Sequence, residues 1–223
     1  MERINWLYRA GEIFVNFYFK ARYQLSLKGT IPKGPCVLLP KHQQMLDIPL
    51  EGHIIYRQTR QPATYVMRGF PFPFNKLFEA LGGIQIARPK DIKKGKITRE
   101  KARRINQAAE QKLINRLKQG DPVIIHPEGT RKYQSMNPIN INPKSMLSKI
   151  VEAQSYLGKI PFVPVGIEYD NQRIRVISAN PFYTDNTKTL EEHLRKEIPK
   201  LSNIIHNTEQ SPENKHPNQP ECP

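Results

Sequence analysis

The stretch CVLLPKHQQMLDIPLEGHIIY, residues 36–56, decides the fold class. Its first five residues form a short apolar run of the kind that makes a buried strand, and the residues from 43 onward are expected to form a helix. A strand followed closely by a helix is the repeating unit of α/β proteins. The stretch therefore predicts an α/β domain with polar residues at the carboxyl end of a strand, where active groups of such proteins tend to lie.

The same alternation continues along the chain. Further β-type runs begin at residues 63, 83, 122, 161 and 174, and helices are expected over residues 98–119, 143–157 and 190–205. For the second of these helices Asn142 is the predicted N-cap and Gly158 the terminator, and Pro199 is expected to interrupt the last one. We therefore expect a single α/β domain over residues 29–206, with a mixed, mostly parallel β-sheet flanked by helices.

The N-terminal residues 4–19 (INWLYRAGEIFVNFYF) carry more aromatic side chains than a soluble surface helix needs. On a helix their polar members, at spacings of 4, 3 and 4, form one narrow stripe: Asn5, Arg9, Glu12 and Asn16. The wide apolar face that remains either lies in a bilayer interface or packs on the domain. We expect residues 1–28 to be an amphipathic membrane-associating segment.

Composition narrows the class of protein. Lys and Arg number 35 against 20 Asp and Glu, a net charge of +15, which favours anionic partners such as phosphates, acidic lipid headgroups or an acidic protein. No run of 18 apolar residues and no secretory signal occurs, and the two cysteines have no metal-ligand spacing. We expect a peripheral or monotopic protein on the cytoplasmic face of a membrane, no metal site, and a disordered tail over residues 207–223.

His42 and Asp47 lie at the junction between the first strand and its helix. A histidine there can accept a proton from a hydroxyl when an acceptor holds its second ring nitrogen, and an aspartate one turn into the helix can be that acceptor. A histidine that caps a helix explains the same pair without any chemistry. Taken alone, the pair leaves both interpretations open.

A second polar cluster, HPEGTRK at residues 126–132, follows the strand that begins at residue 122. Gly129 and Thr130 predict a turn. Glu128 can accept a hydrogen bond, and the guanidinium of Arg131 can bind a phosphate through two parallel hydrogen bonds. Arg88 follows another strand and can reach the same edge of the sheet, although a strand-end arginine is often only solvated. His126 is either a packed strand residue or an additional base.

In combination these blocks resemble the phosphate acyltransferase family, which includes 1-acylglycerol-3-phosphate and glycerol-3-phosphate acyltransferases. The family's H-x4-D block matches His42 and Asp47, its second block resembles the stretch that ends at Arg88, and its third matches PEGTR at residues 127–131. Residues 163–165 (VPV) resemble the fourth. The sequence departs from the family at two positions. Many relatives carry a serine or asparagine in place of Gln44 and an aromatic residue in place of His126, and these departures bear on the choice of acceptor.

The resemblance implies that His42, oriented by Asp47, acts as general base while the acceptor hydroxyl attacks an acyl thioester, which is acyl-CoA or acyl-carrier protein. It also implies that Arg88 and Arg131 contact phosphate, and that Glu128, Gly129 and Thr130 line the acceptor site. The predicted product is phosphatidic acid, made from 1-acylglycerol 3-phosphate without a cofactor. The short N-terminal part favours this acceptor over glycerol 3-phosphate, and another lysophospholipid or a glycolipid is the alternative acceptor.

The segments outside these blocks leave further alternatives. Residues 88–118 hold twelve Lys or Arg against three acidic residues, and they are expected to bind anionic lipid, an acidic carrier protein or the phosphates of coenzyme A, unless they are only a solvated helix face. The phenylalanine-rich residues 69–83 suggest an acyl-chain groove, a second membrane contact or ordinary core. A non-catalytic basic protein that binds membranes or nucleic acid is the alternative from another class; because the chain lacks the usual nucleic-acid modules, we expect no nucleic-acid partner.

Overall fold

The computed structural model describes residues 4–132 and 138–202. The strands are β1 (Gln24–Lys28), β2 (Val37–Pro40), β3 (Thr64–Arg68), β4 (Gly83–Ile86), β5 (Val123–Ile124), β6 (Phe162–Asp170) and β7 (Arg173–Ser178). The helices are α1 (Asn5–Arg22), α2 (Asp47–Thr59), α3 (Phe74–Ala80), α4 (Pro89–Lys93), α5 (Arg99–Lys118), α6 (Met146–Leu157) and α7 (Thr187–Leu201).

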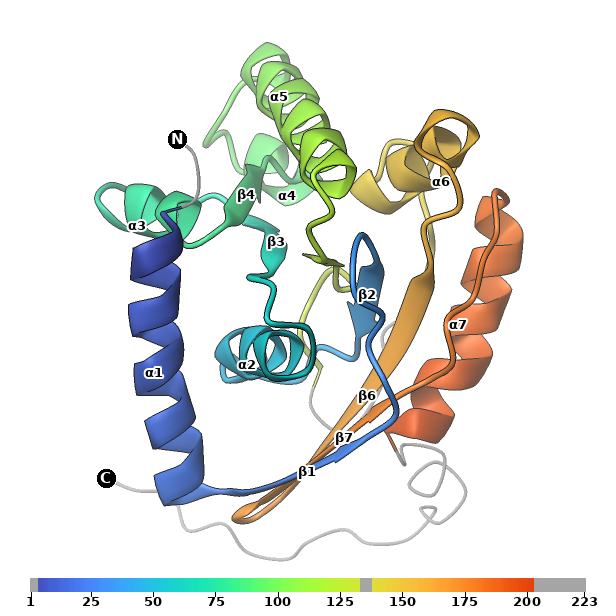
Figure 1. The fold of residues 1–223 in the computed structure, drawn as a ribbon. Coiled ribbons are helices and arrows are strands. Elements are labelled where there is room, and N and C mark those ends of the chain that lie inside the picture. Colours follow the sequence, from blue (N-terminus) through green and yellow to red (C-terminus); the bar gives the residue numbers. More distant parts are fainter. Residues whose placement is uncertain (1–3, 133–137, 203–223) are drawn as a thin grey trace, which may run out of the picture.

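The strands form one seven-stranded sheet in the order β1-β7-β6-β2-β5-β3-β4 (Figure 1). Only the β6–β7 pair is antiparallel among the strand pairs of the described chain. Strands β6, β2, β5, β3 and β4 therefore run in one direction, and their carboxyl ends meet at one edge of the sheet. The prediction of an α/β domain with a mixed, mostly parallel sheet is confirmed.

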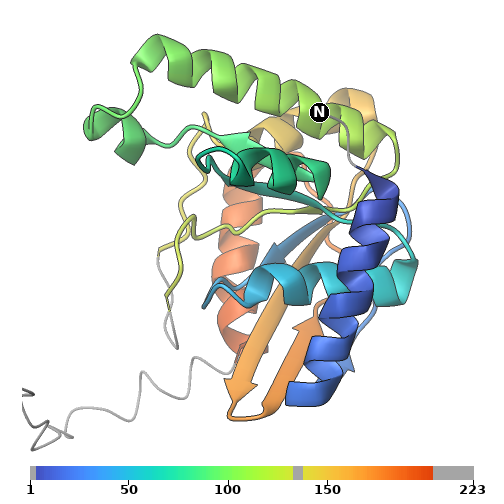
Figure 2. The same cartoon turned by 90° about the vertical axis from the view of Figure 1, so that its left-hand side faces the viewer.

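Helices cover both faces of the sheet, because successive side chains of a strand point to opposite faces. On β2, Val37 and Leu39 pack in one apolar cluster with residues of α5, α6 and α7, whereas Leu38 packs in a second cluster with residues of α1 and α2. Figures 1 and 2 show α1 and α2 on the side opposite α6 and α7. Strand β2 is buried along its whole length between these two layers.

All the strands predicted from the sequence are present, and the structure adds β1, α3 and α4. One predicted cap was wrong: α6 begins after Ser145, whose hydroxyl accepts a hydrogen bond from the amide of Ser148. Asn142 instead closes a preceding turn, since its side chain and its carbonyl accept hydrogen bonds from the amides of Lys144 and Ser145. Gly158 does end this helix, as predicted.

The expected interruption of the last helix at Pro199 was also wrong. Helix α7 continues through Pro199 to Leu201. A proline removes one backbone hydrogen bond, and near the end of a helix few further bonds depend on it. The tail predicted to be disordered, residues 207–223, lies outside the described residues.

Helix α1 has two different apolar faces. One packs on the domain: Phe19 is buried in the α2 cluster, the hydroxyl of Tyr8 accepts a hydrogen bond from the amide of Ala63, and Glu12 lies 2.7 Å from Nδ1 of the buried His53. The opposite face leaves Trp6, Ile13, Phe14 and Phe17 between 71% and 72% exposed. Neither α1 nor any other helix of the described chain has the length and apolar character needed to cross a membrane.

Two small residues mark places of close packing. Gly166 on β6 faces α7 so closely that a Cβ atom would lie 2.4 Å from the carbonyl carbon of Leu201. Cys36, at the start of β2, is fully buried and has a free thiol, and burial raises the pKa of that thiol to about 12. Both contribute to the packing beneath the site and not to its polar surface.

Candidate active site

The loop between β2 and α2 brings His42 and Asp47 together. Oδ2 of Asp47 lies 2.9 Å from Nδ1 of His42, and the same oxygen accepts hydrogen bonds from the amides of Gln43 (2.6 Å) and Gln44 (2.9 Å). Asp47 is the first residue of α2, so its carboxylate closes the loop onto the start of the helix. The loop is therefore folded around the carboxylate that holds the histidine.

Tyr169 completes the environment of Asp47. Its hydroxyl, on β6, donates a 2.5 Å hydrogen bond to Oδ1 of Asp47. Burial opposes ionisation of Asp47, but the hydrogen bonds from His42, Tyr169 and the two amides outweigh it and lower the pKa of the carboxyl. Asp47 is thus an ionised acceptor, which assigns the proton to Nδ1 of His42 and leaves Nε2 with a lone pair. Among the described residues, Nε2 of His42 has no hydrogen-bond partner.

A buried ion pair joins this loop to the HPEGTRK segment. Nζ of Lys41 lies 3.0 Å from Oε1 of Glu128, and neither side chain is exposed. The same ammonium donates hydrogen bonds to the carbonyls of Lys132 (2.8 Å) and His42 (3.2 Å), and the amide of Lys132 donates to the carbonyl of His42. The two polar clusters predicted from the sequence are therefore in direct contact.

The segment turns sharply at Gly129, whose φ is +66°, a left-handed conformation that favours glycine. Gly129, Thr130 and Arg131 are exposed, whereas Glu128 is buried against Lys41. In this structure the carboxylate of Glu128 orients the loop. Its predicted contact with the acceptor stays a prediction, as do those of the three exposed residues.

The ring of His126 stacks on the ring of His42, with centroids 3.9 Å apart and planes inclined by 22°. Nε2 of His126 lies 3.0 Å from Oε1 of Glu51, a buried carboxyl on α2. Burial, reinforced by the charge of Asp47, raises the pKa of Glu51 well above its ordinary value, and burial lowers the pKa of His126 to about 4. The raised pKa of Glu51 favours its protonated form and the lowered pKa of His126 favours the neutral ring, so we assign the proton between them to Glu51, which donates it to Nε2 of His126.

Arg88 lies farther along the same edge of the sheet. It follows β4, three strand positions from β2, which corresponds to about 14 Å across the sheet. Its guanidinium forms an ion pair with Asp91 at 3.1 Å, and the hydrogen bonds of that pair lower the pKa of Asp91. Among the described residues, no contact joins Arg88 to His42 or Asp47.

Arg88 lines an open groove of about 780 Å³ between the β3–α3 loop, β4 and α5. The wall is mixed in character. Basic lining residues are Arg68, Arg88, Lys96 and Lys112, and apolar ones include Phe70, Ile84, Ile86, Ile97 and Ile105. Such a wall suits an amphiphilic anion, with an apolar chain along the groove and a phosphate near the basic side chains.

The aromatic residues of the 69–83 segment differ in whether they line this groove. Phe70 lines it, whereas Phe72 and Phe74 are 79% and 54% exposed. Part of this segment therefore lines the groove, part is surface, and part is packed: Ala80 is buried, and the half-buried Phe78 contacts the ring of Phe70.

Sequence reasoning missed Lys41, Glu51 and Tyr169. Each acts through a partner far along the chain: 87 residues separate Lys41 from Glu128, 75 separate Glu51 from His126, and 122 separate Tyr169 from Asp47. A lysine directly before His42 and a glutamate four residues after Asp47, on the same helix face, are the signals that the sequence offered.

Comparisons with known proteins identify the fold and the family of the chain. The structure is similar to the crystal structure of the 1-acyl-sn-glycerophosphate (LPA) acyltransferase PlsC from Thermotoga maritima, with a TM-score of 0.60, 16% sequence identity, and coverage of 92% of this chain and 81% of that one. No curated protein sequence matches the chain. The profile of the Acyltransferase family matches residues 22–168, which include both polar clusters and Arg88. The chain therefore belongs to the acyltransferase family.

Proposed function

We propose that this acyltransferase transfers a fatty acyl group from an acyl thioester, acyl-CoA or acyl-carrier protein, to the free hydroxyl of 1-acylglycerol 3-phosphate, which gives phosphatidic acid. The observation that carries the proposal is the 2.9 Å contact between Nδ1 of His42 and the buried, ionised Asp47. This contact leaves Nε2 of the same ring as the proton acceptor. The likeness to PlsC supports the choice of acceptor.

In the proposed reaction, Nε2 of His42 takes the proton of the acceptor hydroxyl while that oxygen attacks the thioester carbonyl. A carbon–oxygen bond forms and the carbon–sulfur bond breaks. The imidazolium then gives its proton to the departing thiolate, which leaves as a thiol. Asp47 stabilises the transient imidazolium and holds the ring, in the same manner as the aspartate of a serine hydrolase triad.

Phosphate binding is assigned to Arg88 and Arg131, with Glu128, Gly129 and Thr130 lining the acceptor site. The groove beside Arg88 supports this assignment, because a phosphate and an acyl chain of one molecule find basic and apolar side chains there. Strands β2 and β4, which lead to His42 and Arg88, stand about 14 Å apart across the sheet, so the Arg88 side chain must reach back along this edge to meet a phosphate whose neighbouring hydroxyl lies at His42. Replacing either arginine with alanine is expected to raise KM for the phosphate-bearing acceptor far more than KM for the donor.

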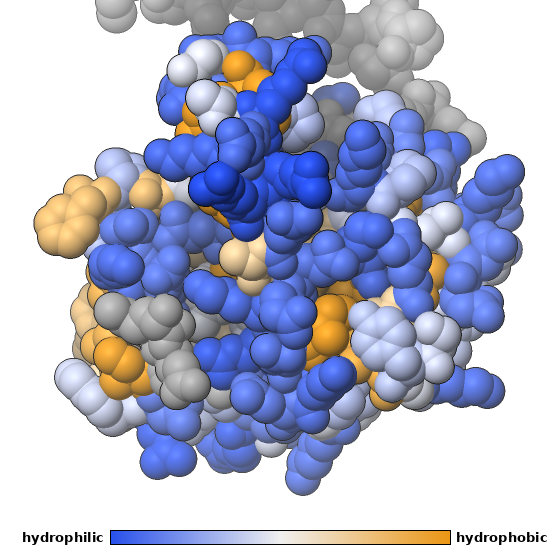
Figure 3. Space-filling model, turned by 90° about the horizontal axis from the view of Figure 1, so that it is seen from above, coloured by the Kyte–Doolittle hydropathy of each residue, from blue (hydrophilic) through white to orange (hydrophobic). Residues whose placement is uncertain are grey.

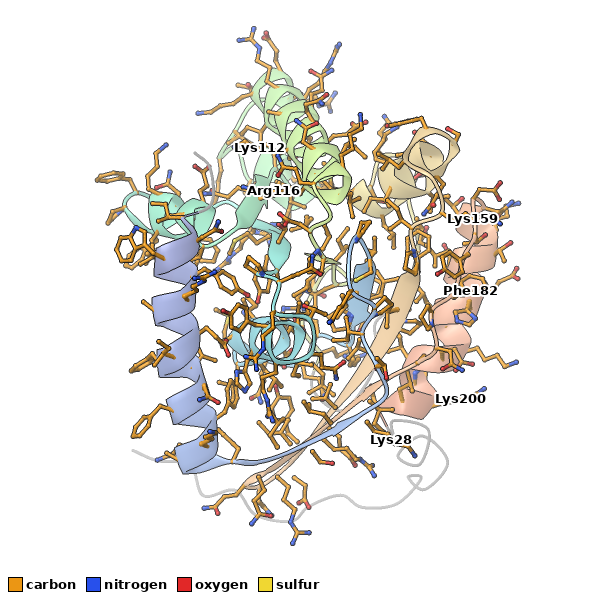
Figure 4. All side chains as sticks on the ribbon, viewed as in Figure 1. Lys28, Lys112, Arg116, Lys159, Phe182 and Lys200 are labelled. Carbon is orange, nitrogen blue, oxygen red and sulfur yellow. The ribbon has the colours of Figure 1, made fainter. Side chains whose placement is uncertain are left out.

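Two surfaces support membrane and donor contacts. The exposed aromatic face of α1 suits a bilayer interface, where one side of a helix enters the headgroup region. The basic residues of α5, among them Lys112 and Arg116 in Figure 4, suit an acidic carrier protein or the phosphates of coenzyme A. We propose that the chain acts at a phospholipid surface on the cytoplasmic side, with residues 1–28 in contact with it.

A donor-by-acceptor matrix tests the proposal. Purified protein is offered acyl-CoA and acyl-carrier protein with 1-acylglycerol 3-phosphate, glycerol 3-phosphate, other lysophospholipids and glycolipids, and thiol release is followed with and without acceptor. His42→Ala is expected to reduce acceptor-dependent release about 10²- to 10⁴-fold, and Asp47→Asn to reduce it strongly as well. Full activity of His42→Ala would refute the mechanism, and lipid binding without turnover on any pair would favour a binding protein.

A further inference from the structure

His126 and Glu51 form a second histidine–carboxyl pair beside the pair of His42 and Asp47. The two carboxyl groups stand four residues apart on α2, so they lie on one face of that helix. Asp47 holds His42, Glu51 holds His126, and the two rings stack at 3.9 Å. One helix therefore fixes two stacked imidazoles by two parallel contacts.

We propose that His126 and Glu51 are positioning residues for His42: the ring of His126 supports one face of the base, and the hydrogen bond from Glu51 keeps that supporting ring in its plane. This inference rests on the proposed function, because it assigns a purpose to the orientation of His42. It goes beyond that function by adding two residues that do not touch the reacting atoms.

The geometry excludes His126 as a second base. Its Nε2 is already engaged by Glu51 at 3.0 Å, and stacked rings do not present their nitrogens to one another. The ring is also largely enclosed, with 12% of its side chain exposed, and the Glu51 side chain is 3% exposed. A stacked, nearly enclosed ring can restrict how His42 tilts and cannot readily reach a substrate hydroxyl.

Burial keeps the supporting ring uncharged, although the neighbouring charges of Asp47 and Glu128 act in the opposite direction. The ionised Asp47 and the ion pair of Lys41 and Glu128 adjoin the two rings, and Glu51 itself lines a small cavity of about 10 Å³ whose wall is mainly apolar. One proton shared between Oε1 of Glu51 and Nε2 of His126 joins the two groups without adding a charge beside His42. A positive ring stacked on His42 would instead oppose the imidazolium that the reaction forms.

Four variants separate support by a ring from support by a charge. His126→Ala removes the ring and is expected to lower kcat about 10- to 100-fold with little change in either KM, because the base is less well oriented. His126→Phe keeps a ring of similar volume and is expected to stay within about threefold of wild type. Glu51→Gln still donates to Nε2 and should be equally mild, whereas Glu51→Leu frees the ring and lowers kcat.

Rescue provides the sharpest test. A phenylalanine needs no hydrogen-bond partner, so His126→Phe introduced into Glu51→Leu is expected to restore most of the lost kcat. A merely structural role predicts lower stability in Glu51→Leu with the remaining folded enzyme fully active. The matched control is His193→Ala, which removes another stacked histidine, 4.0 Å from Phe182 on the α7 side of the sheet, and should leave kcat unchanged.

A readout independent of turnover distinguishes this inference from the proposed function. Nitrogen-15 NMR of the histidine rings is expected to show His42 as a single Nδ1–H tautomer whose ring proton exchanges slowly, and His126→Ala is expected to speed that exchange. His126→Phe and His193→Ala should not. Unchanged exchange in His126→Ala would overturn the inference whether or not the protein is active, as would full kcat of His126→Ala in an enzyme that His42→Ala inactivates.

Discussion

Hydrogen bonds from four groups converge on the carboxylate of Asp47, namely the His42 ring, two loop amides and the Tyr169 hydroxyl. A single buried side chain thereby sets the tautomer of the base, the shape of its loop and the start of α2. Tyr169 provides the contact farthest away in sequence, from the other side of the loop. The consequence is that a change on β6, outside both polar clusters, should alter the chemistry at His42.

Tyr169→Phe tests this consequence. Loss of a hydrogen bond to a charged group is expected to lower the free energy of unfolding by about 1.5–3 kcal/mol and to lower kcat. The pKa of Asp47 should rise, so the stability that its ionisation contributes is lost at a higher pH on acidification than in wild type. Urea unfolding between pH 3 and 7 measures this shift in the pH dependence of stability. Tyr183→Phe is the control, because Tyr183 is 54% exposed, and it should match wild type.

The Glu51–His126 pair predicts an unusual dependence of stability on pH. The folded pair keeps one proton from a pH of about 4, the pKa of His126, up to the raised pKa of Glu51. The unfolded chain also holds one proton between about pH 4.5 and 6.5, two below that range and none above it. The contribution of the pair to the free energy of unfolding is therefore constant between about pH 4.5 and 6.5. It declines on both sides of this range, by up to about 1.4 kcal/mol per pH unit.

Chemical denaturation across pH measures this contribution as the difference between wild type and His126→Phe/Glu51→Leu. The decline above pH 6.5 arises because the unfolded chain releases the histidine proton while the folded pair retains its own. In Glu51→Gln only the histidine remains, so stability should fall on acidification from about pH 6.5 to 4 and show no decline above it. A wild-type profile parallel to that of the double variant would contradict the shared proton.

The sequence indicated the candidate base and its acidic partner, but not the groups that hold them. His42, Asp47 and the residues around Glu128 follow strands whose carboxyl ends share one edge, and strand patterns are readable from local hydrophobicity. Their contact with one another, through Lys41, depends on the strand order, which places β5 directly beside β2. That order is a property of the whole sheet, and no local pattern encodes it.

At the scale of elements, prediction succeeded where the apolar pattern is clear and failed where the element is short or lies at the edge of the sheet. Strand β2 was recognised from its continuous apolar run, and helix α5 from its amphipathic periodicity. Strand β1, at the edge of the sheet, is never fully buried and lies within the segment interpreted as a membrane helix. Helices α3 and α4 are seven and five residues long and are too short for a periodic pattern.

The contact between β6 and α7 carries an element-scale prediction. Gly166→Ala places a methyl group 2.4 Å from the backbone of Leu201, so α7 must move away or the strand must bend. Overpacking of this kind is expected to lower the free energy of unfolding by about 1–3 kcal/mol. Gly11→Ala is the matched control, because a Cβ there meets nothing within 4 Å and the helix should gain up to about 1 kcal/mol.

At the scale of the molecule, charge and apolar surface are separated. In the view of Figure 3, hydrophilic side chains dominate the face, and hydrophobic ones reach the surface in several places, among them the side of α1 and α3. The backbone amide of Ile4 donates a hydrogen bond to the carbonyl of Ala80, which ties the start of α1 to α3. Two neighbouring elements therefore carry exposed aromatic residues. They are Trp6, Phe14 and Phe17 on α1, and Phe72 in the loop that precedes α3.

Membrane contact through α1 is tested by substitution and not by deletion of the helix, because its inner face contributes Phe19 and the Glu12 partner of His53 to the core. Trp6→Ser/Phe14→Ser/Phe17→Ser is expected to lower association with anionic phospholipid vesicles at least about tenfold in a sedimentation assay. Tyr156→Ser/Tyr183→Ser, at exposed aromatic residues of other elements, should not. Equal sedimentation of both variants would contradict membrane contact through α1.

The basic surface of α5 is tested by charge reversal. Lys101→Glu/Arg103→Glu/Lys112→Glu changes three exposed side chains and is expected to raise KM for acyl-carrier protein about tenfold or more at low salt, with a smaller effect at high salt. Lys200→Glu, on α7, is the control for a single exposed charge elsewhere (Figure 4). Unchanged KM for every donor would indicate a merely solvated helix face.

The enclosed thiol of Cys36 makes the reaction simple to follow. Each turnover of the proposed reaction releases one thiol from the donor, and a chromogenic disulfide reagent reports it continuously. A thiolate must attack the disulfide of such a reagent, and a buried thiol with a pKa of about 12 supplies almost no thiolate at the pH of the assay. In a Cys222→Ser background the enzyme itself should be silent, so the colour that develops counts product molecules directly.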